Sequence, residues 1–204
     1  TMSVSISAKE VNELRQKTGS GMMDCKKALV EAGGDFDKAI DILRKKGQKV
    51  SEARSGRETS EGIVLFKIDQ SEDKASMLSF TCETDFVAKN EEFVDLGKSI
   101  LEHSFNNNLD NVEEVLAATI DGLSVSQHIT NLIGKIGEKI EISNFSAVKG
   151  EKIVPYIHAG SKLGVLVSLT GTDGVDYQSA GKDIGMQIAC LLYTSPSPRD
   201  LGKS

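Results

Sequence analysis

The amino-acid sequence predicts an α+β protein, because the spacing of its apolar residues changes along the chain. Residues 7–47 place apolar side chains three or four positions apart, which is typical of amphipathic helices. Residues 63–80 and 139–170 instead contain short apolar runs bounded by polar turns, which is typical of strands. Helical spacing returns between these two regions. The chain is therefore expected to form a helical head followed by a mixed body.

Three short helices are expected in the head, between Ser7 and Gly47. The first begins with a capping box, in which the Ser7 hydroxyl and the Glu10 side chain each bond the other residue's backbone amide. Asp35 is placed to cap the third helix, and Gly47, after a basic last turn, is expected to end it. Other glycines separate the helices: Gly19, Gly21, Gly33 and Gly34. This pattern of three helices, residues 1–47, resembles the ubiquitin-associated fold.

Residues 48–61 are polar throughout and are interpreted as a linker. The body, residues 62–189, is expected to hold an antiparallel sheet packed by helices. Its strands are predicted at 63–68, 75–80, 139–148, 152–158 and 163–170, and its last helix at 177–189. Because short turns join the last three strands, those strands are expected to be neighbours in the sheet.

Composition narrows the classes of partner. The 204 residues carry a net charge of −6, which argues against direct nucleic-acid binding because that function normally needs a basic surface. No apolar run is long enough to span a membrane, and no signal peptide is recognised, so a cytoplasmic protein is expected. The three cysteines have neither disulfide-framework nor zinc-ligand spacing, and Cys25 and Cys82 are expected to be small buried side chains.

The sequence offers no enzyme site. Its three histidines are scattered, and no hydrolase, metalloprotease or Cys/His arrangement is found. Gly19-Ser20-Gly21 precedes a helix, but it lacks the spacing of a phosphate-binding P-loop and favours a tight turn between helices. We therefore predict no catalytic residue, no cofactor, no metal and no small-molecule substrate for this chain.

Residues 84–90, Thr-Asp-Phe-Val-Ala-Lys-Asn, place an acid and a large aromatic side chain at a junction between a strand and a helix. Two interpretations are open from the residues alone. Thr84 or Asp85 caps the helix and Phe86 packs locally as a hydrophobic staple. Alternatively, the aromatic side chain is presented to another protein.

Met22 and Met23 begin the second helix and leave a similar choice. Adjacent helical residues point about 100° apart, so the two side chains are hard to bury together. Either one joins the core while the other covers the helix end, or both form an adaptable apolar patch for a partner. Lys26, one turn after Met22, would place a positive charge beside such a patch.

Both segments, residues 18–27 and 84–90, closely resemble bacterial elongation factor Ts in order and separation. The resemblance runs from about Ser7 to Ala189. It implies a translation factor that binds elongation factor Tu, GDP-bound and nucleotide-free, and promotes GDP release without covalent chemistry. The alternative is a ubiquitin-associated-like adaptor with no exchange activity.

The resemblance also implies a role for individual residues. Thr84, Asp85, Phe86 and Val87 would insert into the nucleotide domain of elongation factor Tu, where Phe86 acts as a wedge and Asp85 helps to dislodge Mg²⁺. Further contacts with elongation factor Tu, outside this inserted segment, are implied for Met22, Met23, Lys26, Ile136, Gly137 and His158. From the residues alone, Gly137 is equally a helix-ending glycine, and a lone histidine such as His158 is more often structural.

The last residues differ in character from the rest. Residues 190–204 can be back-translated into a transposon-type sequencing adaptor, so they are expected to be a non-native tail on a chain truncated at its C-terminus. A native tail rich in proline and serine is the alternative.

Overall fold

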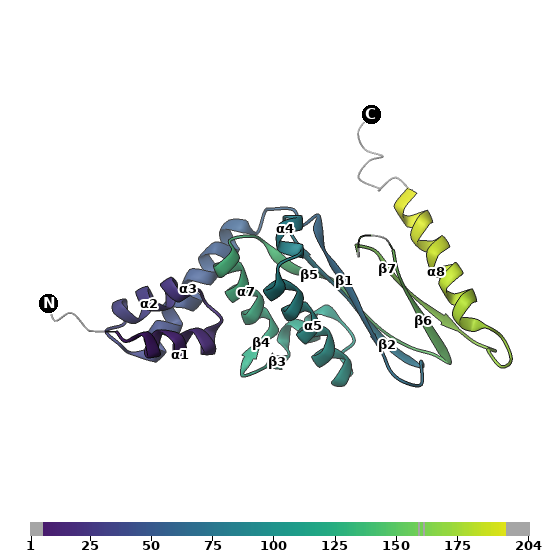
Figure 1. Ribbon diagram of the computed structural model, residues 1–204, viewed down its shortest axis with the longest axis horizontal. Helices are drawn as coiled ribbons and strands as arrows, with labels where there is room; N and C mark the ends of the chain where they lie inside the picture. The colour runs from purple at the N-terminus through teal and green to yellow at the C-terminus, as the bar shows by residue number, and fades with distance from the viewer. Residues whose placement is uncertain (1–5, 159, 161, 195–204) are drawn as a thin grey trace, which may run out of the picture. The chain divides into compact units, whose positions relative to one another are not determined.

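The computed structural model describes residues 6–158, 160 and 162–194, and its elements confirm an α+β protein (Figure 1). The chain divides into two compact units. The first contains Thr1–Glu61, Thr81–Leu96 and Leu116–Glu141, and the second contains Gly62–Phe80, Gly97–Val115 and Ile142–Ser204. Within the described ranges, every helix is too short or too polar to cross a lipid bilayer.

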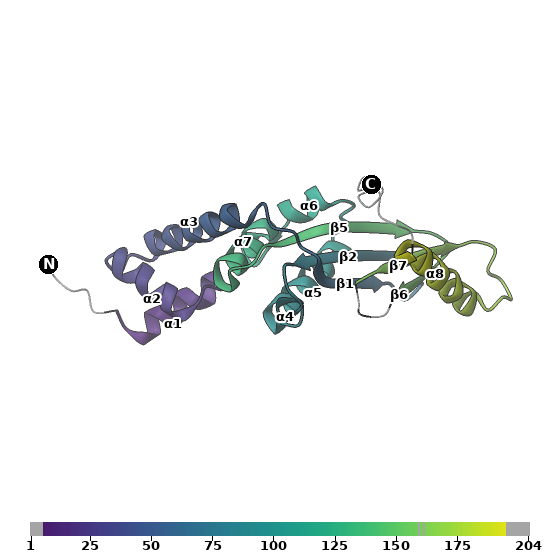
Figure 2. The same cartoon turned by 90° about the horizontal axis from the view of Figure 1, so that it is seen from above.

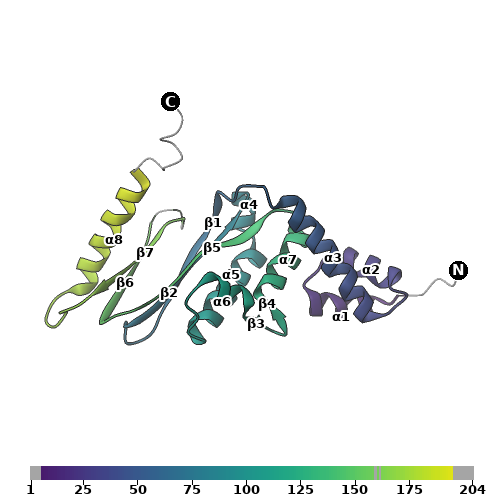
Figure 3. The same ribbon diagram turned by 180° about the vertical axis from the view of Figure 1, so that it is seen from behind.

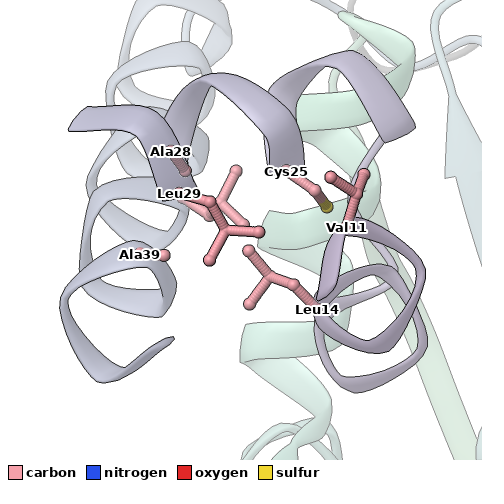
Figure 4. Close-up of a cluster of buried hydrophobic side chains, with 7 residues drawn as sticks. Val11, Leu14, Cys25, Ala28, Leu29 and Ala39 are labelled. Atoms are coloured by element: carbon pink, nitrogen blue, oxygen red, sulfur yellow. The ribbon is translucent and has the colours of Figure 1, made fainter. Parts of the chain in front are cut away.

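The head of the first unit consists of α1 (Ala8–Thr18), α2 (Met22–Glu31) and α3 (Phe36–Arg54). The predicted caps are confirmed: Ser7 and Glu10 form the capping box, and the Asp35 side chain accepts from the Lys38 amide. The three helices share one apolar core, in which Leu14 and Leu29 point toward each other (Figure 4). Its buried members are Val11, Leu14, Cys25, Ala28, Leu29, Ala39 and Leu43.

Helix α3 does not end at Gly47, so that prediction is wrong, and the first residues of the expected linker are helical as far as Arg54. The glycine instead allows α3 to approach α7 (Val125–Ile136) closely. A Cβ atom on Gly47 would lie 3.0 Å from the Thr130 carbonyl oxygen, and one on Gly134 would lie 3.0 Å from the Gly47 Cα. Two glycines therefore face each other where the helices cross.

A small hairpin leads into α7, as Figure 3 shows. It pairs β3 (Thr119–Ile120) with β4 (Leu123–Ser124) in antiparallel fashion. The two connecting residues, Asp121 and Gly122, both have positive φ, as a two-residue hairpin turn requires. Ser124 then forms a second capping box with Gln127 and begins α7.

The larger sheet contains β1 (Glu61–Ile68), β2 (Lys74–Cys82) and β5 (Ile140–Lys149), in the order β1-β2-β5. These three strands confirm the predicted positions. Three helices occupy the sequence between β2 and β3: α4 (Asp85–Ala88), α5 (Glu91–Asn106) and α6 (Val112–Ala117).

The second unit contains a separate antiparallel sheet of β6 (Lys152–Ile157) and β7 (Gly164–Leu169). The expectation that β5 and β6 are neighbours is wrong. After β5, the Gly150 amide donates to the backbone carbonyl oxygen of Asp73 at 2.9 Å, and the Ile153 amide donates to that of Glu72 at 2.6 Å. The turn after β1 therefore takes the hydrogen bonds that a β5–β6 hairpin would need.

Helix α8 (Tyr177–Thr194) packs on β6 and β7 (Figure 2). The packing is close, because Cβ atoms on Gly181 and Gly185 would lie 2.5 and 2.7 Å from side-chain atoms of the sheet. The helix was expected to end at Ala189, and that prediction is wrong, since the residues from Cys190 to Thr194 contain no helix breaker. Residues 195–204 of the expected tail lie outside the described residues.

Candidate functional site

The 84–90 segment forms a projecting tip around the short helix α4. Thr84 has extended backbone angles, and its hydroxyl oxygen accepts from the Val87 amide at 3.5 Å, which confirms it as the N-cap. The Phe86 side chain is 83% exposed. The interpretation of Phe86 as a packed staple is therefore wrong, and a large aromatic ring stands in solvent.

The two sides of α4 have opposite characters. Val87 is only 7% exposed, and Ala88 is buried beside it, so these residues form the covered side of the helix. Asp85 lies on the exposed side, where its carboxylate forms an ion pair with Lys89 at 2.9 Å. An acid and an aromatic ring are thus displayed while the neighbouring valine is held inside.

The residue before the tip, Thr84, is held at three atoms. Glu138 accepts from the Thr84 amide at 3.1 Å and from its hydroxyl at 2.7 Å. The buried thiol of Cys82 donates to the Thr84 carbonyl oxygen at 3.2 Å. Burial, followed by the negative charge of Glu138, raises the pKa of Cys82 to about 12, so this thiol stays protonated and able to donate.

Glu83, one position earlier, makes the complementary contacts. Its carboxylate accepts from the Lys139 amide at 2.6 Å and lies 3.3 Å from the guanidinium of Arg54, the last residue of α3. Residues 83–84 and 138–139 therefore exchange contacts, because each segment supplies a carboxylate to an amide of the other.

The predicted second contact loop follows α7. Gly137 ends that helix with φ of 83° and donates to the Ile133 carbonyl oxygen at 2.8 Å, so its role as a helix-ending glycine is confirmed. Ile136 is half-buried. Through the next residue, Glu138, the structure joins this loop to Thr84, so two of the predicted site segments meet.

The start of α2 also displays apolar side chains. Met22 and Met23 are 54% and 64% exposed, and Lys26 is exposed as well, so the interpretation that buries one methionine is wrong. Gly21 provides the N-cap but no side-chain hydrogen bond.

The turn before α2 rests on two buried side chains. The amide of Ser20 donates to the Thr18 hydroxyl oxygen at 3.3 Å. The thiol of Cys25 donates to the Ser20 carbonyl oxygen at 3.7 Å. These bonds come from beneath the turn and leave the methionines on the surface.

His158 belongs to the second unit, unlike the other predicted site residues. Its ring nitrogen Nδ1 lies 3.2 Å from the Tyr156 hydroxyl, and its amide donates to the Leu163 carbonyl oxygen at 2.8 Å. It thus has clear local partners at the end of β6.

A metal ion would need several donor side chains to gather at these surfaces. Across the described part of the chain, no three His, Cys, Asp or Glu side chains gather as metal ligands. What the tip and the start of α2 share is apolar surface beside a charge, which suits protein recognition.

Comparison of this chain with known protein sequences identifies its family. The family model described as "Elongation factor TS" matches residues 83–197, which begin at the tip. A relative named elongation factor Ts from Amoebophilus asiaticus is 50% identical over 188 residues, covering 92% of this chain and 68% of the relative. The chain belongs to the elongation factor Ts family.

Other elongation factor Ts proteins are similar to the same extent. The protein from Rhodopirellula baltica is 49% identical, with 96% of this chain and 59% of the relative covered. The protein from Cytophaga hutchinsonii is 48% identical, with 91% and 67% covered. The chain thus spans about three-fifths to two-thirds of the length of these relatives. Family membership supports a role as a translation elongation factor.

Sequence reasoning missed the residues that hold the tip. Glu83, Glu138 and Arg54 had no predicted role, although Glu83 directly precedes the motif that identified the elongation factor Ts family. Glu83 precedes Thr84 and Glu138 follows Gly137, so their positions in the chain were visible, but nothing local indicated their contacts or any role for Arg54. Only the folded structure shows which carboxylate accepts from which backbone amide.

Proposed function

We propose that this chain binds elongation factor Tu, both GDP-bound and nucleotide-free, and accelerates GDP release. The observation that carries the proposal is the 83% exposure of Phe86 on a turn whose base is held by several hydrogen bonds. Exposing a large aromatic side chain costs free energy in water unless a partner covers it. A ring held on a braced turn loses little conformational freedom when it enters a pocket.

Exchange follows from linkage between two binding events. A protein that binds the nucleotide-free partner more tightly than the GDP-bound partner must weaken GDP binding by the same factor. Each tenfold weakening needs about 1.4 kcal/mol of differential interaction. In the proposal, Phe86 seats fully only when the partner's helices have separated, and the exposed carboxylate of Asp85 helps to dislodge the Mg²⁺ that holds the phosphates. GTP then rebinds, and this chain performs no covalent chemistry.

The head supplies anchoring in this scheme. Met22, Met23 and Lys26 form an exposed, adaptable patch whose contacts depend less on the nucleotide state. We propose that α1, α2 and α3 form a ubiquitin-associated-like domain, and that the residues after Arg54 lead from it to an α+β core that begins near residue 62. Ile136, Gly137 and His158 are proposed as further contacts with elongation factor Tu in the bacterial cytoplasm.

The test is stopped-flow release of a fluorescent GDP analogue from elongation factor Tu, with this chain and with Phe86→Ala. Loss of about 2 kcal/mol, typical of a buried aromatic at an interface, would slow the accelerated release by roughly thirtyfold. Phe66→Ala is the matched control, because Phe66 is an exposed aromatic residue on β1, outside the proposed contacts. Equal acceleration by the wild-type chain and Phe86→Ala would refute the wedge, and no acceleration by the wild type would refute the exchange function.

A further inference from the structure

The helix that carries Phe86 is too short to hold its own orientation. Helix α4 has four residues, and its backbone bonds are those of one turn, such as Ala88 to the Thr84 carbonyl oxygen at 3.2 Å. An isolated helical turn is unstable, because its nucleation cost exceeds the gain from so few bonds. The direction of Phe86 must therefore be set by contacts outside α4.

Glu138 provides the most direct of these contacts. Its carboxylate accepts hydrogen bonds from both the amide and the hydroxyl of Thr84, at 3.1 and 2.7 Å. A carboxylate accepting two such bonds fixes both the backbone and the side-chain rotamer of the N-cap. Because the Thr84 proton points to Glu138, a lone pair of the same oxygen is left to accept from Val87.

Glu83 fixes the same junction from the other side. Its bond to the Lys139 amide ties the end of β2 to the residue after Glu138, and its ion pair with Arg54 ties both to the end of α3. The Glu83 side chain is largely buried and that of Arg54 is partly covered, so this pair is less screened than an exposed one. Two carboxylates thus clamp one strand-to-helix junction.

We propose that Glu138 is a positioning residue, which orients Phe86 through Thr84, with Glu83 and Arg54 as the second half of the clamp. This inference rests on the proposed exchange function only for its kinetic consequence. Glu138 does not need to touch the partner. Without the carboxylate, Thr84 keeps the Cys82 contact but loses two bonds, so α4 samples more orientations and Phe86 inserts less often.

Two measurements on the full chain test the proposal. Hydrogen exchange of residues 84–90 in the free chain reports the order of the tip without a partner. GDP-release kinetics then separate the maximal rate from the half-saturating concentration. For Glu138→Ala we expect faster hydrogen exchange in the tip and a maximal release rate lowered about tenfold, the factor that corresponds to about 1.4 kcal/mol. The half-saturating concentration should change by less than about twofold, because the head still anchors the chain.

Companion variants distinguish positioning from direct contact. Glu138→Gln keeps one acceptor oxygen and should recover part of both losses, which also decides the matter if Glu138→Ala fails to fold. Thr84→Val removes the hydroxyl and Thr84→Ser keeps it. If Glu138 acts through Thr84, then Thr84→Val costs less in the Glu138→Ala background than alone. Glu113→Ala, an exposed acid on α6, should behave as wild type.

The outcomes separate this proposal from the exchange function. Unchanged hydrogen exchange in Glu138→Ala and Glu138→Gln would overturn the positioning role, whatever the kinetics show. Strictly additive kinetic losses of Glu138→Ala and Thr84→Val would also overturn it, because they indicate a direct contact of Glu138 with the partner. A wild-type chain without exchange activity would refute the proposed function, and the hydrogen-exchange comparison would still decide whether Glu138 orders the tip.

Discussion

The starts of α2 and α4 expose apolar side chains in two different ways. At α2, two flexible methionines follow Gly21, an N-cap without a side-chain bond. At α4, one stiff aromatic ring follows Thr84, an N-cap held by a carboxylate. A flexible side chain on a lightly capped helix can adapt to a partner, whereas an aromatic ring on a clamped one keeps its direction. The first arrangement suits anchoring and the second suits insertion.

Both regions rest on a buried cysteine whose thiol donates to a backbone carbonyl oxygen. Cys25 supports the turn before α2, and Cys82 supports the N-cap of α4. Burial raises the pKa of both thiols, and for Cys82 burial, followed by the negative charge of Glu138, raises the pKa to about 12. The clamped region should therefore show the stronger pH response.

The largest expected effect is the protection of Cys82 from alkylation. At pH 8, a thiol of pKa about 12 has roughly a thousandth of the thiolate of an ordinary cysteine, so buried Cys82 should be labelled far more slowly than exposed Cys190. The measurement is mass-spectrometric mapping of iodoacetamide labelling over time. Labelling of Cys82 as fast as Cys190 in the folded chain would contradict the thiol's place beneath Thr84.

The same shift gives a pH dependence of stability. Because the pKa of Cys82 is higher in the folded than in the unfolded chain, its stabilising contribution is complete below about pH 9. That contribution is lost as pH rises from about 9 toward 12, where the unfolded thiol has already released its proton. Urea unfolding at pH 8 and pH 10.5 should show a steeper loss for the wild type than for Cys82→Ala, and equal slopes would contradict the shift.

The next effect compares the two apolar surfaces directly. We expect Met22→Ala with Met23→Ala to raise the half-saturating concentration for GDP release about tenfold, a loss of about 1.4 kcal/mol of anchoring. The maximal rate should stay near that of the wild type, whereas Phe86→Ala should lower it. Val30→Ala is the matched control, since Val30 is an exposed apolar residue near the other end of α2. A fall in maximal rate alone, in the methionine variant, would remove the distinction between anchoring and insertion.

The smallest expected effect concerns the N-cap of α2, Gly21, which makes no side-chain hydrogen bond. Gly21 has extended backbone angles and room for a side chain, so Gly21→Ser should stabilise α2 by about 0.3 kcal/mol through a new N-cap bond. Thermal unfolding followed by circular dichroism measures this gain. Gly33→Ser is the control with the opposite expectation, because Gly33 has φ of 65° and a side chain there is strained. Destabilisation by Gly21→Ser would show that the turn before α2 is less tolerant than its geometry indicates.

Local signals in the sequence predicted local structure well. The capping box at Ser7, the cap at Asp35 and the N-cap at Thr84 were all recognisable, because each depends on residues three positions apart. The β3–β4 hairpin was not predicted, although Asp121-Gly122 is a typical two-residue turn and supplied the signal.

Long-range features could not be predicted in the same way. A glycine that ends a helix and one that allows close packing look alike in sequence, so Gly47 was misassigned. The choice of β2 as the partner of β5 depends on strands far apart in the chain. At the site, the exposed residues were foreseen through the family resemblance, but the bond between Glu138 and Thr84 joins residues 54 positions apart and had no local signal.

The crossing of α3 and α7 has a practical consequence for anyone who edits this protein. Where Gly47 and Gly134 face each other, even one added methyl group would meet backbone atoms at 3.0 Å. A Gly134→Ala substitution would therefore force α3 and α7 apart by a few tenths of an ångström without altering an exposed residue. The same crossing offers a place to cross-link, because Gly47→Cys together with Gly134→Cys would join the head to α7 and hold the two helices at this slightly wider spacing.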